Sequence, residues 1–422
     1  MSQAQVSQAK DLVGPGDQAG RLRAQLVDRL VADGKITSPA VEAAFRTVPR
    51  EAFVPAGTAL DVTYSVDNSL VTKTDEYGMN ISSVSATYIQ ARMIEMAGIR
   101  AGMTVLEIGS GGYNAALLAE VVGPAGHVVS VDLDAEITDR ARDLLDRTGY
   151  NAPVTVVRAD AEHRVPGFER FDRTLVTVGA WDISPAWLDQ LTPDGVLVVP
   201  LRMNGVTRTI AFGRRSDHLR SVGTEVAGFV PMQGAGAHPD RTFPLTDGFG
   251  GQVTLRFDAG VPETADQLDG APATTPTSAW SGVTVGQGVS FADLHLWLAT
   301  RLPGFCRVDA EPRTLLTARP DEKWFPYGCV RSDAFAGMTT RPAHEIEGGG
   351  AEFGAIAYGP HGQAAAAKLV DEIRAWDRHA RHREPPAFAY WPAGSDHTQI
   401  PAHAAVLRKR HGAVSICWPE KS

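Results

Sequence analysis

The chain has 422 residues, of which 43% are hydrophobic and 21% charged, and its formal net charge is −9 at pH 7. The length favours two domains and the composition is that of a soluble globular protein, whereas the negative charge argues against a general nucleic-acid partner. No apolar run approaches the roughly 20 residues that span a membrane. The polar N-terminus and three scattered cysteines favour a cytoplasmic protein without a metal site.

The first half of the chain predicts a helical start and then alternating strands and helices. Residues 1–20 are polar and predict a mobile tail. Leu22–Val31 repeats apolar residues at helical spacing, and Ser38-Pro39 is typical of a helix N-terminus. Strands are then predicted at Thr104–Ile108, His127–Asp132, Val154–Arg158, Arg173–Val178 and Gly195–Leu201. Helices are predicted between them at Asn114–Val122, at Glu136–Arg147 and from Ser184 onward. This alternation predicts a doubly wound, Rossmann-like α/β domain over residues 21–232.

The remaining residues predict a second domain of α+β class over residues 233–422. Arg208–Arg214 and Glu225–Val230 are predicted as late antiparallel strands that precede it. Gln233–Gly236 is predicted as a linker, and Pro262–Thr284, rich in Pro, Ala, Thr and Ser, as an exposed loop. Further elements are predicted as a helix from Ser290, a strand at Glu352–Tyr358, a helix at His361–Arg378, and strands at Ala387–Tyr390 and Val414–Cys417.

A glycine-rich turn joins the first predicted strand of the sheet to its helix. The strand ends in Glu107-Ile108, and Gly109-Ser110-Gly111-Gly112-Tyr113 follows. Glycine lets a ligand approach the backbone, and the free N–H groups of the helix start point at that ligand. The second strand ends in Asp132, which is placed to hold a ribose diol. Together these features predict a cofactor that carries a nucleoside.

Two kinds of cofactor compete for this pattern. A dinucleotide site normally has G-x-G-x-x-G and a pyrophosphate over the helix start. Here the glycines read G-S-G-G, and the carboxylate of Glu107 would repel a pyrophosphate. A carboxylate at this position suits a cationic ligand, so S-adenosylmethionine is the favoured cofactor.

Several blocks resemble the protein-L-isoaspartate O-methyltransferases, whose fold is the class I methyltransferase fold. The resemblance covers most of Arg21–Met232. The blocks that carry it are Val48–Pro55, which resembles "PR-x-x-F-V-P", Glu107–Glu120, Phe171-Asp172, Trp187–Leu191, Val198–Pro200, and Phe229–Met232, which is similar to "F-V-P-L".

The sequence departs from the family pattern in the glycine loop, which affects the backbone path at the cofactor, and in the acceptor segment, which affects substrate choice. The glycine loop is one residue shorter than is usual in the family. The signature "T-I-S-x-P-Y-x-V-A-x-M" is replaced by Ser83–Met93, in which Thr87 stands where the family has proline. The preceding segment, Val71–Asn80, is also several residues longer. Substrate recognition is therefore the property expected to have changed.

The resemblance also implies roles for individual residues. Ser85 is expected to hydrogen-bond the acceptor carboxyl, with Ser82, Ser83 and Thr87 as rivals; the alternative is that Ser85 caps the following helix. Glu107 and the loop are expected at the methionyl end of the cofactor, Asp132 at the ribose, Asp160 at the adenine, and Thr177 and Val178 along the cleft. The full set of expected cofactor residues is Glu107, Gly109, Ser110, Gly111, Gly112, Tyr113, Asp132, Leu133, Asp160, Ala161 and Thr177.

The sequence leaves three main functions open, with a small-molecule carboxyl methyltransferase as a further, less favoured alternative. The leading hypothesis is an aspartate O-methyltransferase of a ribosomally made, lanthipeptide-type precursor, whose methyl ester closes to a succinimide and opens to isoaspartate; the C-terminal domain would hold the peptide. The first alternative is an isoaspartate O-methyltransferase that repairs damaged proteins. The second is a methyltransferase-like binding protein without activity. A carboxylate is already a nucleophile at neutral pH, so either reaction needs positioning more than a general base.

Overall fold

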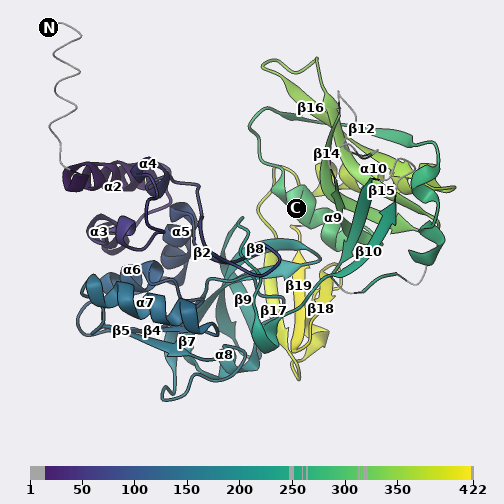
Figure 1. Ribbon diagram of the computed structural model, residues 1–422. Coiled ribbons are helices and arrows are strands. Elements are labelled where there is room, and N and C mark those ends of the chain that lie inside the picture. The colour runs from purple at the N-terminus through teal and green to yellow at the C-terminus, as the bar shows by residue number, and fades with distance from the viewer. Residues whose placement is uncertain are drawn as a thin grey trace, which may run out of the picture. The chain divides into compact units, whose positions relative to one another are not determined.

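The computed structural model describes residues 15–246, 251–258, 260–262, 265–311, 314, 316 and 322–419. The chain divides into two compact units (Figure 1). Unit 1 runs to Ala237 but leaves out Arg202–Thr207, the tip of a strand hairpin; unit 2 holds this tip and the chain from His238. Among the described helices, none has both the length and the apolar character that crossing a membrane requires.

Unit 1 begins with helices and one hairpin. In chain order these are α2 (Pro15–Ala32), α3 (Pro39–Thr47), η1 (Arg50–Ala52), α4 (Leu60–Thr63), β1 (Leu70–Thr74), β2 (Asn80–Val84) and α5 (Thr87–Ala97). The predicted tail is too long, because α2 already begins at Pro15, and residues 1–14 lie outside the described part. Helix α3 begins as predicted, with Ser38 at the N-cap and Pro39 as its first residue.

The centre of unit 1 is a sheet in the order β9-β8-β7-β6-β3-β4-β5. Its parallel strands are β3 (Thr104–Ile108), β4 (His127–Asp132), β5 (Val154–Arg158), β6 (Phe171–Val176) and β7 (Leu191–Met203). The intervening helices are α6 (Tyr113–Val122), α7 (Ala135–Arg147) and α8 (Pro185–Asp189). The predicted doubly wound α/β fold is confirmed, and the bounds of β3, β4 and β5 are those predicted.

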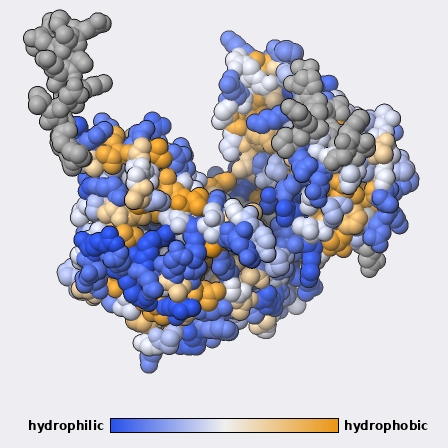
Figure 2. Space-filling model, viewed as in Figure 1, coloured by the Kyte–Doolittle hydropathy of each residue, from blue (hydrophilic) through white to orange (hydrophobic). Residues whose placement is uncertain are grey.

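Strand β3 marks the point where the strand order reverses. It pairs with β4 on one side and with β6 on the other. Chain connections leave in opposite directions there, so a crevice opens beyond the carboxyl ends of the two strands. Helix α7 buries Ile137, Ala141 and Leu145 inward, while Figure 2 shows a hydrophilic surface where α7 faces solvent.

The antiparallel end of this sheet differs from the prediction. Strand β8 is Val206–Arg215 and β9 is His218–Glu225, so the predicted strand at Glu225–Val230 is wrong. The two residues between β8 and β9 turn the chain straight back, and β9 pairs with β8 at once. The predicted linker at Gln233–Gly236 contains the short helix η2 (Gly234–Gly236), which belongs to unit 1.

Unit 2 contains an antiparallel sheet of seven strands in the order β10-β11-β13-β14-β15-β16-β12. These are β10 (Arg241–Thr246), β11 (Gln252–Phe257), β12 (Thr277–Gly286), β13 (Phe305–Ala310), β14 (Lys323–Arg331), β15 (Ala334–Pro342) and β16 (Gly350–Tyr358). The other elements are η3 (Ala265–Leu268), η4 (Ala271–Ala273), α9 (Ala292–Arg301), α10 (Gly362–His379), β17 (Ala387–Pro392), η5 (His397–Gln399), β18 (Ala405–Arg408) and β19 (Gly412–Cys417). The predicted α+β class of this region is confirmed.

One prediction for unit 2 is wrong. Pro262–Thr284 is not a loop throughout, because β12 begins at Thr277 and pairs with β16, where Thr277 lies opposite Ala357. The partner strand lies about 80 residues away in the sequence, so local composition gave no sign of the pairing. The sheet has its own buried apolar cluster, which includes Val253, Leu255 and Phe335.

Candidate functional site

Three adjoining cavities lie in unit 1 where the strand order reverses. The Asp132 cavity is lined by the ends of β3 and β4 and by residues 231–233. The Glu107 cavity shares Gly109 with it. The outer cavity, which includes Asp67, Met79 and Tyr88, shares Ser83, Ser85, Thr177 and Phe229 with the Glu107 cavity. One elongated ligand could therefore occupy the first two cavities and meet a second ligand in the third.

A close contact between the glycine loop and the end of β6 shapes this crevice. Gly109 has φ +97°, and a Cβ atom there would lie 2.5 Å from Oγ1 of Thr177. The Thr177 hydroxyl instead lies 3.0 Å from the carbonyl oxygen of Ile108 and 2.9 Å from that of Gly109, and donates to them. Only glycine allows both the backbone angle and this approach. Thr177 is thus a cleft residue, as predicted, and also fixes the loop.

Glu107 is a fully buried carboxyl group at the end of β3. Its Oε1 accepts a hydrogen bond from Nδ2 of Asn114 at 2.9 Å, and its Oε2 accepts one from the Ser130 hydroxyl. Burial raises the pKa of Glu107 to about 7. The two hydrogen bonds lower this pKa, whereas the nearby Asp132 carboxylate raises it further. A cation in the Glu107 cavity would favour the ionised form.

Asp132 lies at the end of β4, where the sequence predicted it. Its Oδ2 accepts from the backbone N–H of Ser110 at 3.0 Å, and its Oδ1 accepts from that of Asp134 at 3.0 Å. Burial raises the pKa of Asp132, against the lowering effect of these hydrogen bonds. Leu133 and Ala161, two further predicted residues, line the same cavity. A diol that bonds this carboxylate would meet an oriented acceptor.

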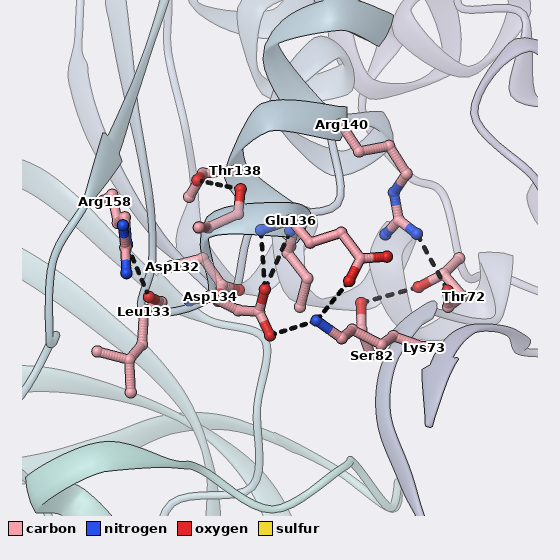
Figure 3. A network of polar contacts seen from close by, with 12 residues as sticks. Thr72, Lys73, Ser82, Asp132, Leu133, Asp134, Glu136, Thr138, Arg140 and Arg158 are labelled. Atoms are coloured by element: carbon pink, nitrogen blue, oxygen red, sulfur yellow. Dashed lines mark hydrogen bonds and ion pairs between the residues drawn. The ribbon is translucent and has the colours of Figure 1, made fainter. Parts of the chain in front are cut away.

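The β1–β2 hairpin is held against the start of α7 (Figure 3). Nζ of Lys73 lies 2.7 Å from Oδ2 of Asp134 and 2.7 Å from Oε2 of Glu136. Nη1 of Arg140 donates to the Thr72 carbonyl oxygen at 3.2 Å. The same Asp134 caps α7 through its Oδ1 and bonds Asp132 through its backbone N–H. The hairpin is therefore tied to the turn that holds Asp132.

Strand β2 and the residue after it supply a wall to all three cavities. Ile81 lines the Asp132 cavity, whereas Ser83 and Ser85 line both the Glu107 and the outer cavities. These alternate residues share one face of an extended segment. Within the described part of the chain, neither the Ser83 nor the Ser85 hydroxyl has a protein hydrogen-bond partner, so both are open to a ligand.

The other two candidate hydroxyls are engaged elsewhere. Thr87 is fully buried, and its hydroxyl lies 3.2 Å from the carbonyl oxygen of Ser65 and 3.1 Å from that of Val66. Ser82 accepts a hydrogen bond from Thr72 across the hairpin at 2.8 Å. Thr87 is therefore not placed for an acceptor contact, contrary to the prediction. Ser85 does not cap α5 either, because the N-cap residue is Ala86.

Asp160 lines the Asp132 cavity, but its carboxylate also holds backbone. Oδ1 accepts from the N–H of Glu162 at 3.0 Å, and Oδ2 accepts from that of Ala235 at 2.8 Å. A Cβ atom on Gly234 would lie 2.4 Å from Oδ2 of Asp160. Gln233 thus lines the Asp132 cavity and the next two residues contact Asp160, where the sequence had predicted only a linker.

Some of the remaining residues of the glycine loop line the Glu107 cavity, and the others hold the loop in place. Gly111 and Tyr113 line the Glu107 cavity. Ser110 is buried behind it, with its hydroxyl oxygen 2.9 Å from that of Ser130. Gly112, the N-cap of α6, has φ +84°, and a Cβ atom there would lie 3.2 Å from the Phe53 ring. Ser110 and Gly112 therefore support the loop and do not line any of the three cavities.

Several lining residues were not predicted. They are Ile81, Gln90, Met93, Met232 and Gln233, whereas Val178 lines the Asp132 cavity as expected of a cleft residue. The alternation of Ile81, Ser83 and Ser85 on one face of an extended segment could have identified Ile81. The others come from elements whose contacts depend on the tertiary fold.

Gly109→Ala should destabilise unit 1 and disturb the crevice. The positive φ and the contact with Thr177 together predict a loss of about 1–3 kcal/mol in the free energy of unfolding. Chemical denaturation measures this loss. Gly111→Ala is the matched control, because a Cβ atom there has open space; equal losses in both variants would contradict the role of the Thr177 contact.

Glu107→Gln should change how stability depends on pH. The folded-state pKa of about 7 exceeds the ordinary value of 4.5, so the folded protein holds this proton more tightly than the unfolded chain. The resulting stability is complete below pH 4.5 and is lost as the pH rises through 7, an amount of up to about 3 kcal/mol. Denaturation of ligand-free protein between pH 5 and 8 should show this decline in the wild type relative to Glu107→Gln. Parallel curves for the two proteins would refute it.

The part of the chain that forms the crevice is similar in sequence to a known protein family. The sequence profile of the family described as Protein-L-isoaspartate(D-aspartate) O-methyltransferase (PCMT) matches residues 21–236, just over half of the chain. The protein-L-isoaspartate O-methyltransferase of Hyperthermus butylicus is 38% identical over 190 residues, which are 42% of this chain and 74% of that protein. That of Methanococcoides burtonii is 34% identical over 221 residues, which are 50% of this chain and 98% of that protein.

Solved structures with the same description are also similar to this chain. One protein-L-isoaspartate O-methyltransferase is 26% identical with a TM-score of 0.47, over 59% of this chain and 91% of its own. A Plasmodium falciparum protein in complex with S-adenosyl-L-homocysteine is 13% identical with a TM-score of 0.42. The match covers 50% of this chain and 97% of that protein's chain. The family profile and the sequence relatives decide the assignment: the chain belongs to the protein-L-isoaspartate (D-aspartate) O-methyltransferase family.

Proposed function

We propose that this protein is an S-adenosylmethionine-dependent O-methyltransferase that acts on the free carboxylate of isoaspartyl residues in peptides or proteins. The observation that carries the proposal is that the three cavities adjoin through shared lining residues, from Asp132 past Glu107 to two serine hydroxyls that have no hydrogen-bond partner among the described residues. The family membership of residues 21–236 supports the same activity.

The residues of the first two cavities fit this cofactor. Asp132 offers a carboxylate to a ribose diol, and Ile81, Val178 and Met232 offer apolar contact to a nucleobase. Glu107 offers a buried negative charge to the ammonium and sulfonium groups of the methionyl part. A pyrophosphate would meet repulsion at Glu107, so a dinucleotide fits less well.

The outer cavity fits a carboxylate acceptor. When bound, S-adenosylmethionine supplies a methyl group on a sulfonium sulfur, so one carboxylate oxygen forms the new C–O bond as the C–S bond breaks. The Ser83 and Ser85 hydroxyls donate to the acceptor carboxylate and orient it. The β1–β2 hairpin covers the reacting groups and limits the access of water. The chain thus contributes mainly positioning, which can lower the barrier of a two-substrate reaction by several kcal/mol.

The comparisons favour isoaspartyl substrates over a dedicated precursor peptide. The similar proteins carry the general isoaspartate methyltransferase description, and none of those compared points to lanthipeptide biosynthesis. Methylation of an aspartyl side chain in a ribosomally made precursor, with closure to a succinimide, stays the narrower alternative. A binding protein without activity is disfavoured because Glu107, Asp132 and the free serine hydroxyls meet in one crevice.

Unit 2 is proposed as an accessory domain that helps to hold the polypeptide substrate. The family profile ends at residue 236, and unit 2 has a separate sheet and apolar cluster. The reaction site lies within unit 1, so unit 2 is not needed to assemble the three cavities. Its contribution would therefore appear in the affinity for long substrates.

Two variants should separate cofactor binding from turnover. Asp132→Ala should weaken S-adenosylmethionine binding by about 1.5–3 kcal/mol, because hydrogen bonds to a charged group are lost. Ser85→Ala should lower kcat and leave cofactor affinity nearly unchanged, because Ser85 faces the acceptor. Calorimetric titration and steady-state kinetics measure the two effects. A large loss of cofactor affinity in Ser85→Ala would remove Ser85 from the acceptor site.

A substrate assay tests the proposed function directly. Purified full-length protein and S-adenosylmethionine are incubated with matched isoaspartyl and aspartyl peptides, in short and long versions, and with a ribosomal precursor peptide encoded next to the gene. We expect mass spectrometry to show methyl gain on isoaspartyl peptides, with a lower KM for the long version if unit 2 holds the chain. Methyl gain followed by loss of methanol on the precursor alone would favour the narrower alternative.

A further inference from the structure

Arg50 is a fully buried arginine beside the Glu107 cavity. Its Nε donates to the carbonyl oxygen of Thr63, its Nη1 to Oε1 of Gln90 and its Nη2 to the carbonyl oxygen of Ser85, each at 2.9 Å. Its guanidinium carbon also lies 5.0 Å from the centre of the Tyr113 ring. One side chain therefore touches four separate segments of unit 1.

Three of these four contacts are walls of the Glu107 cavity. Ser85 follows β2, Gln90 lies on α5 and Tyr113 begins α6, and all three line that cavity. The rigid, planar fork of a guanidinium fixes the direction of each donor, which a flexible ammonium cannot do. The Ser85 carbonyl group is thus held at a set distance from the start of α6.

The hydrogen-bond acceptors of Arg50 are uncharged. The bonds go to two carbonyl groups and one amide, and burial lowers the pKa of Arg50. Burying a cation without a directly bonded carboxylate costs free energy. Stability alone does not account for such a charge at this place, whereas the placement of cavity walls does.

The local sequence explains how Arg50 reaches this place. Pro49 precedes the short helix η1, which begins at Arg50. Phe53 follows in the same block, with its ring 5.7 Å from that of Tyr113. The block Val48–Pro55 therefore packs against the start of α6, where Arg50 and Phe53 both contact Tyr113.

We infer that Arg50 is a positioning residue for methyl transfer, acting through Ser85 and the walls of the Glu107 cavity. This inference rests on the proposed function. Arg50 sets where the Ser85 hydroxyl stands relative to the methionyl end of the cofactor. Its role is geometric, so a lysine that keeps the charge does not replace it.

Kinetics of Arg50→Lys test the inference. We expect kcat on an isoaspartyl peptide to fall about tenfold to a hundredfold, since small displacements of positioning groups have effects of this size. The dissociation constant for S-adenosylmethionine, measured by calorimetry, should rise by a smaller factor than kcat falls. Because Arg50 acts through Ser85, Ser85→Ala should cost less in the Arg50→Lys background than in the wild type.

A matched control separates positioning from stability. Arg173 is partly buried and also donates to main-chain carbonyl groups, those of Ala97 at 2.5 Å and Asp172 at 2.7 Å, but it lines none of the three cavities. Arg173→Lys should lower the melting temperature and leave kcat unchanged. If Arg50→Lys does not fold, Gln90→Met, which removes one acceptor of Arg50, should give a smaller fall of kcat in the same direction.

The outcomes distinguish the two proposals. Wild-type protein without activity on any of the peptides would overturn both the proposed function and the role of Arg50. Active wild type with an unchanged kcat in Arg50→Lys would overturn the role of Arg50 alone. The same holds if the kcat losses of Arg50→Lys and Ser85→Ala simply multiply, because Arg50 would then act independently of Ser85.

Discussion

The crevice of unit 1 depends on the close approach of the β3–α6 loop to the end of β6. Gly109 lies where a side chain would collide with the Thr177 hydroxyl, and that hydroxyl donates to the carbonyl groups of the consecutive residues Ile108 and Gly109. With the loop held there, the Ser110 N–H reaches Asp132 and the carboxyl group of Glu107 lies behind the turn. The charged groups of the site therefore occupy positions that the backbone sets.

The opposite wall is assembled from residues that lie before the sheet in the sequence. The β1–β2 hairpin brings Ile81, Ser83 and Ser85 over the cavities. Lys73 ties this hairpin to the N-terminus of α7, and Arg50 ties its end to α5 and α6. The proposed cofactor contacts and acceptor contacts thus share one wall, so a shift of the hairpin would affect both cavities.

Unit 2 contains a second sheet. Its sheet is antiparallel throughout and carries its own buried apolar cluster. The family profile covers residues 21–236, and the Methanococcoides burtonii relative is covered almost completely by half of this chain. Most of unit 2 therefore lies outside the part of the chain that matches the family profile.

The sequence by itself determined the strands of the parallel sheet and the main polar residues at their ends. β3, β4 and β5 were predicted to the residue, because each is a short apolar run that ends at a polar residue or glycine. β6 and β7 begin earlier than predicted, at Phe171 and Leu191. Gly109, Glu107 and Asp132 follow from the same signal, since each lies at the end of such a run. The family was also visible in these blocks.

Only the tertiary structure decided which side chains meet. Ser85 and Thr87 are two residues apart, yet one faces the cavities and the other bonds the carbonyl groups of Ser65 and Val66. The contact of residues 233–235 with Asp160, and the pairing of β12 with β16, join segments about 75 to 80 residues apart. Arg50 belongs to a block that resembles the family motif, but the sequence does not show which segments it contacts. Local pattern reports periodicity and turn chemistry, whereas these contacts depend on how distant segments fold against one another.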